Sequence, residues 1–170
     1  EACDAVRKVL EGAKAPLEYE YKDCGVEAVN KYGTNLPDET VESVMRTRVG
    51  LKGPTATGIG TGQQSANVQL RKRLDLFASL RPVRSLPGVK TRYDDVDLIV
   101  VRENTEDLYA GIEHEVTPGT VVSMKTSTTR AGERIARWGF EYMRYRGRRL
   151  VHCCHKAPVN PLADGNFLAA

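Results

Sequence analysis

The spacing of hydrophobic and polar positions predicts alternating helices and strands along most of the chain. Apolar residues recur with the period of a one-sided helix in several stretches, and shorter apolar or alternating runs between them are typical of strands. The predicted helices are residues 1–12, 26–32, a helix starting near 37, 65–74 and 131–145. The predicted strands are 17–21, 49–51, 76–83, 97–102 and 150–154. This order indicates an α/β fold.

The run Leu98 to Val101 is the clearest strand, because its residues are continuously apolar. Such a run is expected where a strand is buried on both faces. Arg102 follows at its carboxyl end, where open α/β sheets place ligands. Taken alone, an arginine at a strand end is more often a partner in a surface ion pair.

A hairpin and two packed helix faces complete the predicted architecture. Thr117-Pro-Gly119 punctuates two strand-like stretches, 113–116 and 121–129. We expect two stripes to be core packing. They are Val41, Val44 and Met45 in the helix near 37, and Ile135, Trp138, Tyr142 and Tyr145 in the helix 131–145.

Candidate chemistry gathers where a glycine-rich loop, Gly58 to Gly62, runs into a helix that begins with Ser65. A loop of this kind can cradle an anion on free backbone N–H groups, although a flexible surface turn has the same composition. Asn67 and Arg71 are four apart and share a helix face. Guanidinium groups bind carboxylates through paired, charge-assisted hydrogen bonds, so this stretch fits a multiply charged carboxylate.

Composition narrows the classes of protein. The chain has 170 residues, 41% hydrophobic and 28% charged, as in a globular domain. Its net charge of +3 is too small to argue for nucleic acid, and no apolar run is long enough for a bilayer. Adjacent Cys153 and Cys154 make a poor disulfide framework, so we expect reduced thiols and a cytoplasmic protein, or a mitochondrial-matrix protein in a eukaryote.

His152-Cys-Cys-His155 invites a zinc interpretation. Neighbouring side chains on a strand point to opposite faces, so at most two of the four residues could share a site. Structural zinc sites usually need four ligands from separated pairs. We therefore expect no zinc site at this motif.

Several motifs together resemble the isocitrate dehydrogenases within the metal-dependent β-decarboxylating dehydrogenases. The matching segments are 51–54, 65–67, 70–71, 75–78, 81–84, 87–88 and, as the longest, Arg102 to Glu113. The resemblance extends from Glu1 to about Phe167 and implies that the chain is the first half of such an enzyme. It implies residues 1–77 in a large α/β domain and 78–170 in a small domain. The hairpin at about 113–129 would pair with a neighbouring subunit.

The same resemblance implies roles for individual residues. Tyr109 would protonate the carbon left by carbon dioxide, and Lys156 would act as base or relay in the neighbouring subunit's site. The substrate would be held by Ser65, Asn67, Arg71, Arg81 and Arg102, and the cofactor, NAD or NADP, by Thr57 and Asn104. The family's Mg²⁺ or Mn²⁺ would be held by carboxylates outside this chain. Pro158 departs from the pattern, because asparagine is usual there.

The resemblance implies oxidative decarboxylation of isocitrate to 2-oxoglutarate, in a homodimer or a hetero-oligomer of related subunits. Homoisocitrate or 3-isopropylmalate dehydrogenase is the nearest alternative, although the Ser65 and Asn67 pair favours isocitrate. A non-catalytic, regulatory subunit is another, although such subunits tend to lose the binding arginines. A nucleic-acid-binding module is the remotest interpretation.

Overall fold

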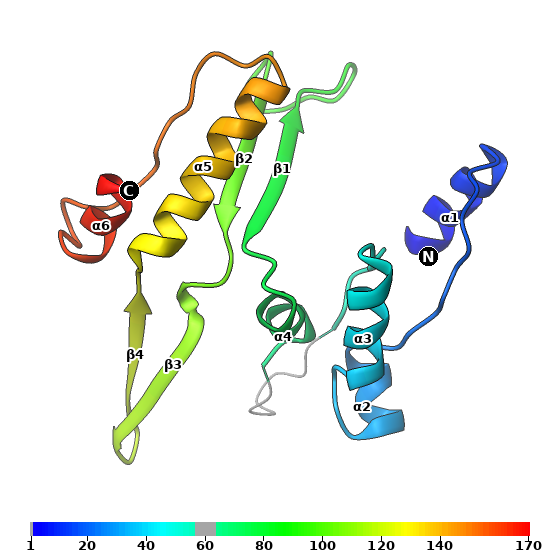
Figure 1. Ribbon diagram of the computed structural model, residues 1–170, viewed down its shortest axis with the longest axis horizontal. Coiled ribbons are helices and arrows are strands. Elements are labelled where there is room, and N and C mark those ends of the chain that lie inside the picture. Colours follow the sequence, from blue (N-terminus) through cyan, green and yellow to red (C-terminus); the bar gives the residue numbers. More distant parts are fainter. Residues whose placement is uncertain (1, 57–63) are drawn as a thin grey trace. The chain divides into compact units, whose positions relative to one another are not determined.

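The computed structural model describes residues 2–56 and 64–170, and it divides into two compact units, Glu1–Leu74 and Asp75–Ala170 (Figure 1). The first unit is helical in its described part, and the second combines two hairpins with two helices. No helix in the described ranges has the length and apolar character needed to cross a membrane.

The first unit consists of α1 (Ala2–Gly12), α2 (Val26–Tyr32), α3 (Asp38–Thr47) and α4 (Ala66–Arg73). Its core is small: Ala28, Leu36, Val41 and Ala66 are at most 4% exposed. Gly33 ends α2 in the left-handed conformation, at φ 71°, and its N–H donates to the carbonyl of Val29. This conformation favours glycine, and it explains the helix end predicted there.

The second unit is built from two antiparallel pairs. Strand β1 (Ala78–Arg84) pairs with β2 (Asp97–Glu103), and β3 (Asp107–Thr117) pairs with β4 (Thr120–Thr126). Helix α5 (Thr129–Tyr145) contacts β2, and α6 (Ala163–Ala169) packs on α5. Figure 1 shows α5 running alongside the β1–β2 hairpin.

The hairpin predicted around Thr117-Pro-Gly119 is present, with β3 starting at Asp107 and β4 ending at Thr126. Pro118 and Gly119 form its turn, and Gly119 has φ 80°. A turn with proline first and a positive φ second needs glycine at the second position, which explains why this tripeptide marks the reversal.

Strand β2 confirms the strand predicted at 97–102, but its predicted burial on both faces is wrong. Leu98 and Val100 are 45% and 43% exposed, whereas Ile99 and Val101 are less exposed. The strand belongs to a two-stranded sheet, and α5 covers only the face that carries Ile99 and Val101. A continuous apolar run therefore does not prove that both faces are covered within this chain.

Residues 17–21, 49–51 and 150–154 do not form the predicted strands. Among the described residues, no neighbouring strand lies beside these segments to complete a ladder of backbone hydrogen bonds. Alternating or β-branched sequence favours extended backbone, but a strand exists only where a partner accepts and donates. Helix α6, which has seven residues, was not predicted from the sequence.

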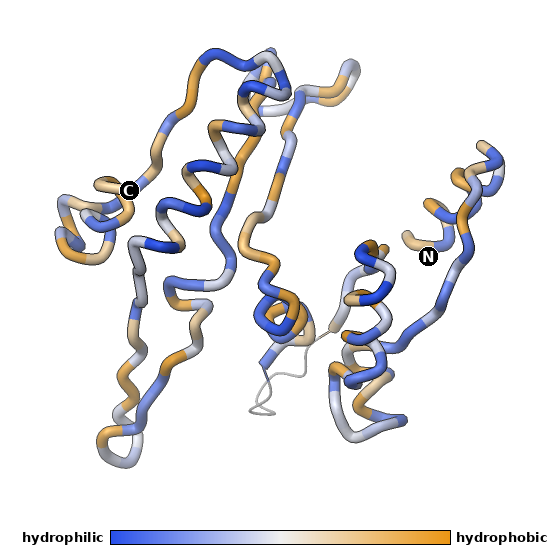
Figure 2. The backbone as a smooth tube through the Cα atoms, viewed as in Figure 1, coloured by the Kyte–Doolittle hydropathy of each residue, from blue (hydrophilic) through white to orange (hydrophobic). Residues whose placement is uncertain are grey.

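The two predicted core stripes are only partly buried. Ile135 is 5% exposed and Trp138 stacks on Tyr142 at a ring separation of 5.1 Å, but Tyr145 is 81% exposed. In α3, Val41 is buried and Met45 is 56% exposed. Figure 2 shows hydrophobic and hydrophilic positions alternating along α5. The sequence period gives the correct face, while the extent of burial depends on what covers it.

Candidate functional site

The N-terminus of α4 carries the first group of predicted substrate residues. Ser65 is the N-cap residue, and its Oγ accepts a hydrogen bond from the backbone N–H of Asn67 at 3.3 Å. The Oδ1 atom of Asn67 is buried and has no partner among the described residues. An unpaired buried carbonyl oxygen costs free energy, which a bound donor group would recover.

Two amides that the sequence did not single out hold this helix start in place. Asn35, 7% exposed, donates from Nδ2 to the carbonyl of Gln64 at 2.6 Å. Gln69 donates from Nε2 to Asn35 Oδ1 at 2.9 Å and to the same carbonyl at 3.0 Å. The residue before Ser65 is thus fixed by two side chains. No local pattern points to Asn35, because it lies far from α4 in sequence.

The basic residues at the end of α4 have different surroundings. Arg73 is paired with Asp38, Nη2 to Oδ1 at 2.7 Å, as expected for a charged surface residue. Arg71 is less exposed and forms no ion pair with a carboxylate of the described chain. Of these two arginines, Arg71 is therefore the one whose charge remains available for a ligand.

Arg81, Arg102 and Tyr109 form the second group, on the sheet face opposite α5. Ser79 lies opposite Arg102 and Arg81 lies opposite Val100, so both arginines project from one face as diagonal neighbours. The Arg102 Nη2 atom donates to Tyr109 Oη at 2.7 Å, and its guanidinium lies 4.9 Å from the ring centre. Neither arginine is ion-paired within the described residues. Two like charges on one face favour an anionic ligand.

The turn after β2 fixes the backbone that carries Arg102 and Asn104. The Glu103 carboxylate accepts from the N–H groups of Thr105 and Glu106 at 2.8 and 2.9 Å. Asn104 is 7% exposed, and its own N–H donates to the carbonyl of Phe77 at 2.9 Å. Asn104 is therefore mostly buried, and its backbone is bonded to that of Phe77.

Helix α5 is tied to the same turn. Arg134 donates to Asp75 Oδ2 at 2.6 Å and lies over the Phe77 ring, 4.1 Å from its centre. Glu106 accepts from the N–H and the hydroxyl of Thr128, the N-cap residue of α5, at 2.8 and 2.5 Å. The matching run 102–113 thus mixes residues facing the open side with residues that only hold the turn, and the sequence did not separate them.

Lys156 lies in an exposed turn before α6. Its carbonyl accepts from the N–H groups of Val159 and Asn160, both at 2.9 Å, and its own N–H donates to Asp164 Oδ2 at 2.7 Å. Pro158 has no N–H, and the bonds of this turn need none from that position. The unusual proline is therefore compatible with the turn.

Asp164 is also bound by Lys125 of β4. The hydrogen bond from Lys125 is the main cause that lowers the pKa of Asp164, with the Lys156 N–H contributing further. The same bond raises the pKa of Lys125. Both groups are consequently charged across the neutral range.

The predicted residues fall into two groups, Ser65, Asn67 and Arg71 in the first unit, and Arg81, Arg102, Asn104, Tyr109 and Lys156 in the second. Within the second unit, the structure joins Arg102 to Tyr109, and no recorded contact joins Lys156 to either. Thr57 and the glycines of 58–62 lie outside the described residues.

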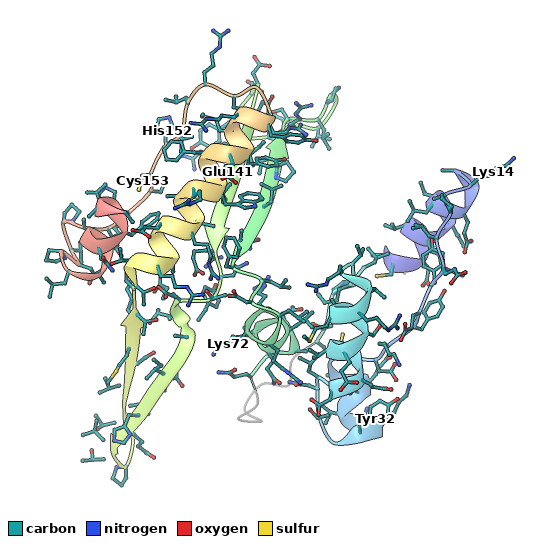
Figure 3. The ribbon with its side chains drawn as sticks, viewed as in Figure 1. Lys14, Tyr32, Lys72, Glu141, His152 and Cys153 are labelled. Carbon is teal, nitrogen blue, oxygen red and sulfur yellow. The ribbon has the colours of Figure 1, made fainter. Side chains whose placement is uncertain are left out.

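The described side chains do not form a metal centre. Within residues 2–56 and 64–170, no three His, Cys, Asp or Glu side chains gather as a ligand set. Figure 3 shows His152 and Cys153 on the segment between α5 and α6, where both are exposed. The residues present here therefore do not by themselves fit the divalent cation that the resemblance implies.

Comparison with known proteins shows the family to which this α/β chain belongs. The family model described as isocitrate/isopropylmalate dehydrogenase matches residues 1–168. The chain belongs to this family, and the resemblance drawn from its motifs is confirmed.

Three known proteins show how similar the chain is to members of the family. It is 47% identical over 99% of its length to 3-isopropylmalate dehydrogenase, chloroplastic, of Solanum tuberosum, covering 47% of that protein. It is 48% identical over 99% of its length to isocitrate dehydrogenase [NAD] catalytic subunit 5, mitochondrial, of Arabidopsis thaliana, covering 45%. The isocitrate dehydrogenase structure from Methylococcus capsulatus has a TM-score of 0.93 at 40% identity, over 98% of this chain and 50% of that one.

The chain thus spans about half the length of the relatives it matches, and it has the corresponding part of their fold. A relative named as a regulatory subunit, from Arabidopsis thaliana, is 47% identical over 97% of the chain. Overall identity therefore does not separate catalytic from regulatory members, or isocitrate from 3-isopropylmalate.

Proposed function

We propose that this chain supplies the carboxylate-binding and proton-transferring part of an NAD(P)-dependent isocitrate dehydrogenase. The reaction is the oxidation of isocitrate and loss of carbon dioxide to give 2-oxoglutarate. The observation that carries the proposal is the Arg102–Tyr109 hydrogen bond, on a face shared with Arg81 and without a competing carboxylate. An acid group and two cations side by side suit a substrate that is itself a carboxylate.

Each residue would have its own role. Arg102 donates to the Tyr109 oxygen, which leaves the phenolic proton free to be given to a substrate carbon. Arg81 and Arg102 hold substrate carboxylates, which lysine could not do with the same paired geometry. Lys156 would act as base or relay for the substrate hydroxyl in the neighbouring subunit's site.

The first unit would contribute further contacts, with Ser65, Asn67 and Arg71 binding the carboxylate that distinguishes isocitrate. The buried Asn67 Oδ1 lacks a partner among the described residues and, being an acceptor, would take a donor such as the substrate hydroxyl, while the carboxylate would accept from Arg71 and Ser65. Thr57 and Asn104 would contact the nicotinamide cofactor, NAD or NADP, which accepts hydride when bound. The described residues form no ligand set for Mg²⁺ or Mn²⁺.

The proposal extends to assembly and location. Residues 1–77 would belong to a large domain and 78–170 to a small one, whose β3–β4 hairpin pairs with a neighbouring subunit in a homodimer or hetero-oligomer. The exposed apolar residues Ile112, Val121 and Met124 on both strands support that pairing. The protein would work in the cytoplasm, or in the mitochondrial matrix of a eukaryote.

A chimeric enzyme tests the substrate. Residues 1–170 replace the matching half of the Methylococcus capsulatus isocitrate dehydrogenase, and kcat/KM is measured for isocitrate, 3-isopropylmalate and homoisocitrate with NAD and with NADP. We expect isocitrate to be preferred by at least about 100-fold, because a site with unpaired polar groups rejects substrates that leave them unpaired. The parent enzyme and a thermal melt serve as controls for assembly.

The same assay decides between the alternatives. A preference for 3-isopropylmalate would overturn the proposal, and the potato relative makes that the alternative with most support. A folded chimera that binds isocitrate without turning it over would instead indicate a regulatory subunit, as the Arabidopsis relative is named.

A further inference from the structure

We propose that Asp164 is the residue that positions Lys156, and that Lys125 in turn holds Asp164. This inference deepens the proposed function and rests on Lys156 acting as its base. The resemblance gives no role to Asp164 or Lys125, and it does not say what holds Lys156 in position.

The backbone of Lys156 is held on both of its polar groups. Its N–H donates to Asp164 Oδ2 at 2.7 Å, and its carbonyl accepts from Val159 and Asn160 at 2.9 Å. The ammonium group makes no recorded contact within the described residues. A fixed backbone carrying a free, flexible side chain is the arrangement needed to deliver an amine to a reaction outside its own turn.

Asp164 can perform this role because its two oxygens have different partners. Oδ2 accepts from Lys156, and Oδ1 accepts from the Lys125 ammonium on β4. The Asp164 side chain is 13% exposed, so water competes only weakly for it. A carboxylate held by a charged donor on one oxygen is a stable acceptor on the other.

The anchor extends through α6 to the start of α5. Asn166 donates to the carbonyl of Ser127 at 3.2 Å and accepts from the Thr129 hydroxyl at 2.9 Å. Gly132 of α5 allows the close approach, since a Cβ there would lie 2.9 Å from that of Ala170. Lys156 is therefore connected to β4 and α5 through Asp164 and the short helix α6, although its own segment is not a strand.

The surroundings of Lys125 supply a matched control. Asp107 of β3 is a second carboxylate near the ammonium, at 3.9 Å, and it has no contact with Lys156. If Asp164 acts only by neutralising Lys125, removing the Asp107 charge should have a comparable effect. If Asp164 acts by holding Lys156, the two substitutions should differ.

The test uses the chimeric enzyme with Asp164→Ala, Asp164→Asn, Lys125→Met and Asp107→Asn. We expect kcat for isocitrate to fall about 100-fold in Asp164→Ala with KM within about threefold, because misplacing a catalytic group by an ångström costs that much. Asp164→Asn keeps an oxygen acceptor, so its kcat should stay close to that of the unsubstituted chimera. Lys125→Met should lie between them, and Asp107→Asn should stay within about twofold.

A second measurement separates this inference from the proposed function. Hydrogen exchange of the Lys156 backbone amide, followed by NMR in the 170-residue chain, should quicken in Asp164→Ala and stay slow in Asp107→Asn. If exchange quickens but kcat is unchanged, Asp164 does not position the base and the inference is wrong. If Lys156→Met itself keeps full activity, the proposed role of Lys156 is wrong instead.

Folding defects give a different pattern. A loss of thermal stability with equal falls in kcat for Asp164→Ala and Asp164→Asn would show a merely structural role and would also overturn the inference. Rescue by the asparagine variant, with unchanged KM, is the result that a structural role does not produce.

Discussion

The two hairpins of the second unit have the same local design and different surroundings. β1–β2 has α5 on one face, so Ile99 and Val101 are partly buried, whereas β3–β4 leaves Val116, Val121 and Met124 more than half exposed. The β3–β4 hairpin was predicted from its turn residues, whereas β1 and β2 were predicted only as separate strands, and neither signal reveals what covers a strand. The difference teaches that the β1–β2 hairpin is stabilised within the chain, while the apolar faces of β3–β4 remain available to a partner.

The largest expected effect comes from the core that only β1–β2 has. Ile135→Ala should lower the free energy of unfolding of the second unit by about 3 kcal/mol, because Ile135 is 5% exposed and deleting it leaves a cavity. Val121→Ala, at a site 61% exposed, should change it by less than about 0.5 kcal/mol. Urea unfolding followed by the fluorescence of Trp138 measures both. Equal losses would contradict the contrast between the hairpins.

A smaller effect is expected where the second hairpin meets α5. Thr128 caps that helix, its hydroxyl accepting from Ala131 at 3.2 Å, and its N–H donates to Glu106 at 2.8 Å. Thr128→Ala should cost about 1 kcal/mol, the usual value for losing an N-cap hydroxyl. Thr128→Ser keeps the hydroxyl and is the matched control. If both variants unfold at the same urea concentration, the cap contributes nothing measurable.

The hairpins and helices of the second unit illustrate which features the sequence predicts. Helix periods and turn residues act locally, so α5, the hairpin turn at Pro118 and Gly119, and strand β2 were predicted correctly. The strands at 17–21 and 150–154 were not confirmed, since strand pairing depends on residues far along the chain. Whether a helix covers a strand face also depends on residues far along the chain.

In the candidate site, too, local features were predicted and those that depend on distant residues were not. Motif residues such as Arg102 and Tyr109 were found by resemblance, and the structure adds that they contact each other. Asn35 and Asp164 were missed, because the hydrogen-bond partners that give them their place are distant in sequence. Asn35 donates to the carbonyl of Gln64, and Asp164 accepts from Lys125. Asparagine and aspartate are also common in turns for purely local reasons, so their presence alone indicates no such role.

Acid should weaken both hairpin regions. Hydrogen bonds from Arg148, and then from Arg84, lower the pKa of Asp97, and the bond from Lys125 lowers the pKa of Asp164. Each folded-state pKa lies below the unfolded value of 3.8, so their stabilisation is fully present above pH 3.8 and is lost as pH falls through the folded pKa. Melting temperatures between pH 6 and pH 2 should show the loss.

Single variants divide that pH dependence between the regions. Asp97→Asn should reduce the part of the fall in melting temperature at low pH that comes from β1–β2. Asp164→Asn should reduce the part that comes from β4 and α6. The Asp97 side chain is about half exposed, so the change in Asp97→Asn is expected to be the smaller of the two. If neither variant alters the fall in melting temperature at low pH, other carboxylates are responsible for it.

A small change in stability is also expected at the bond that joins the hairpins, from Arg102 on β2 to Tyr109 on β3. Tyr109→Phe removes the hydroxyl and keeps the ring under the guanidinium. Tyr109 is 38% exposed, so water can replace the lost partner of Arg102, and the free energy of unfolding should fall by less than about 1 kcal/mol. In the chimeric enzyme the same change should lower kcat by about 100-fold or more, as expected when a general acid is lost. Stability and activity should therefore separate at this residue. A stability loss above about 2 kcal/mol with normal kcat would make Tyr109 a structural clamp between the hairpins and not an acid.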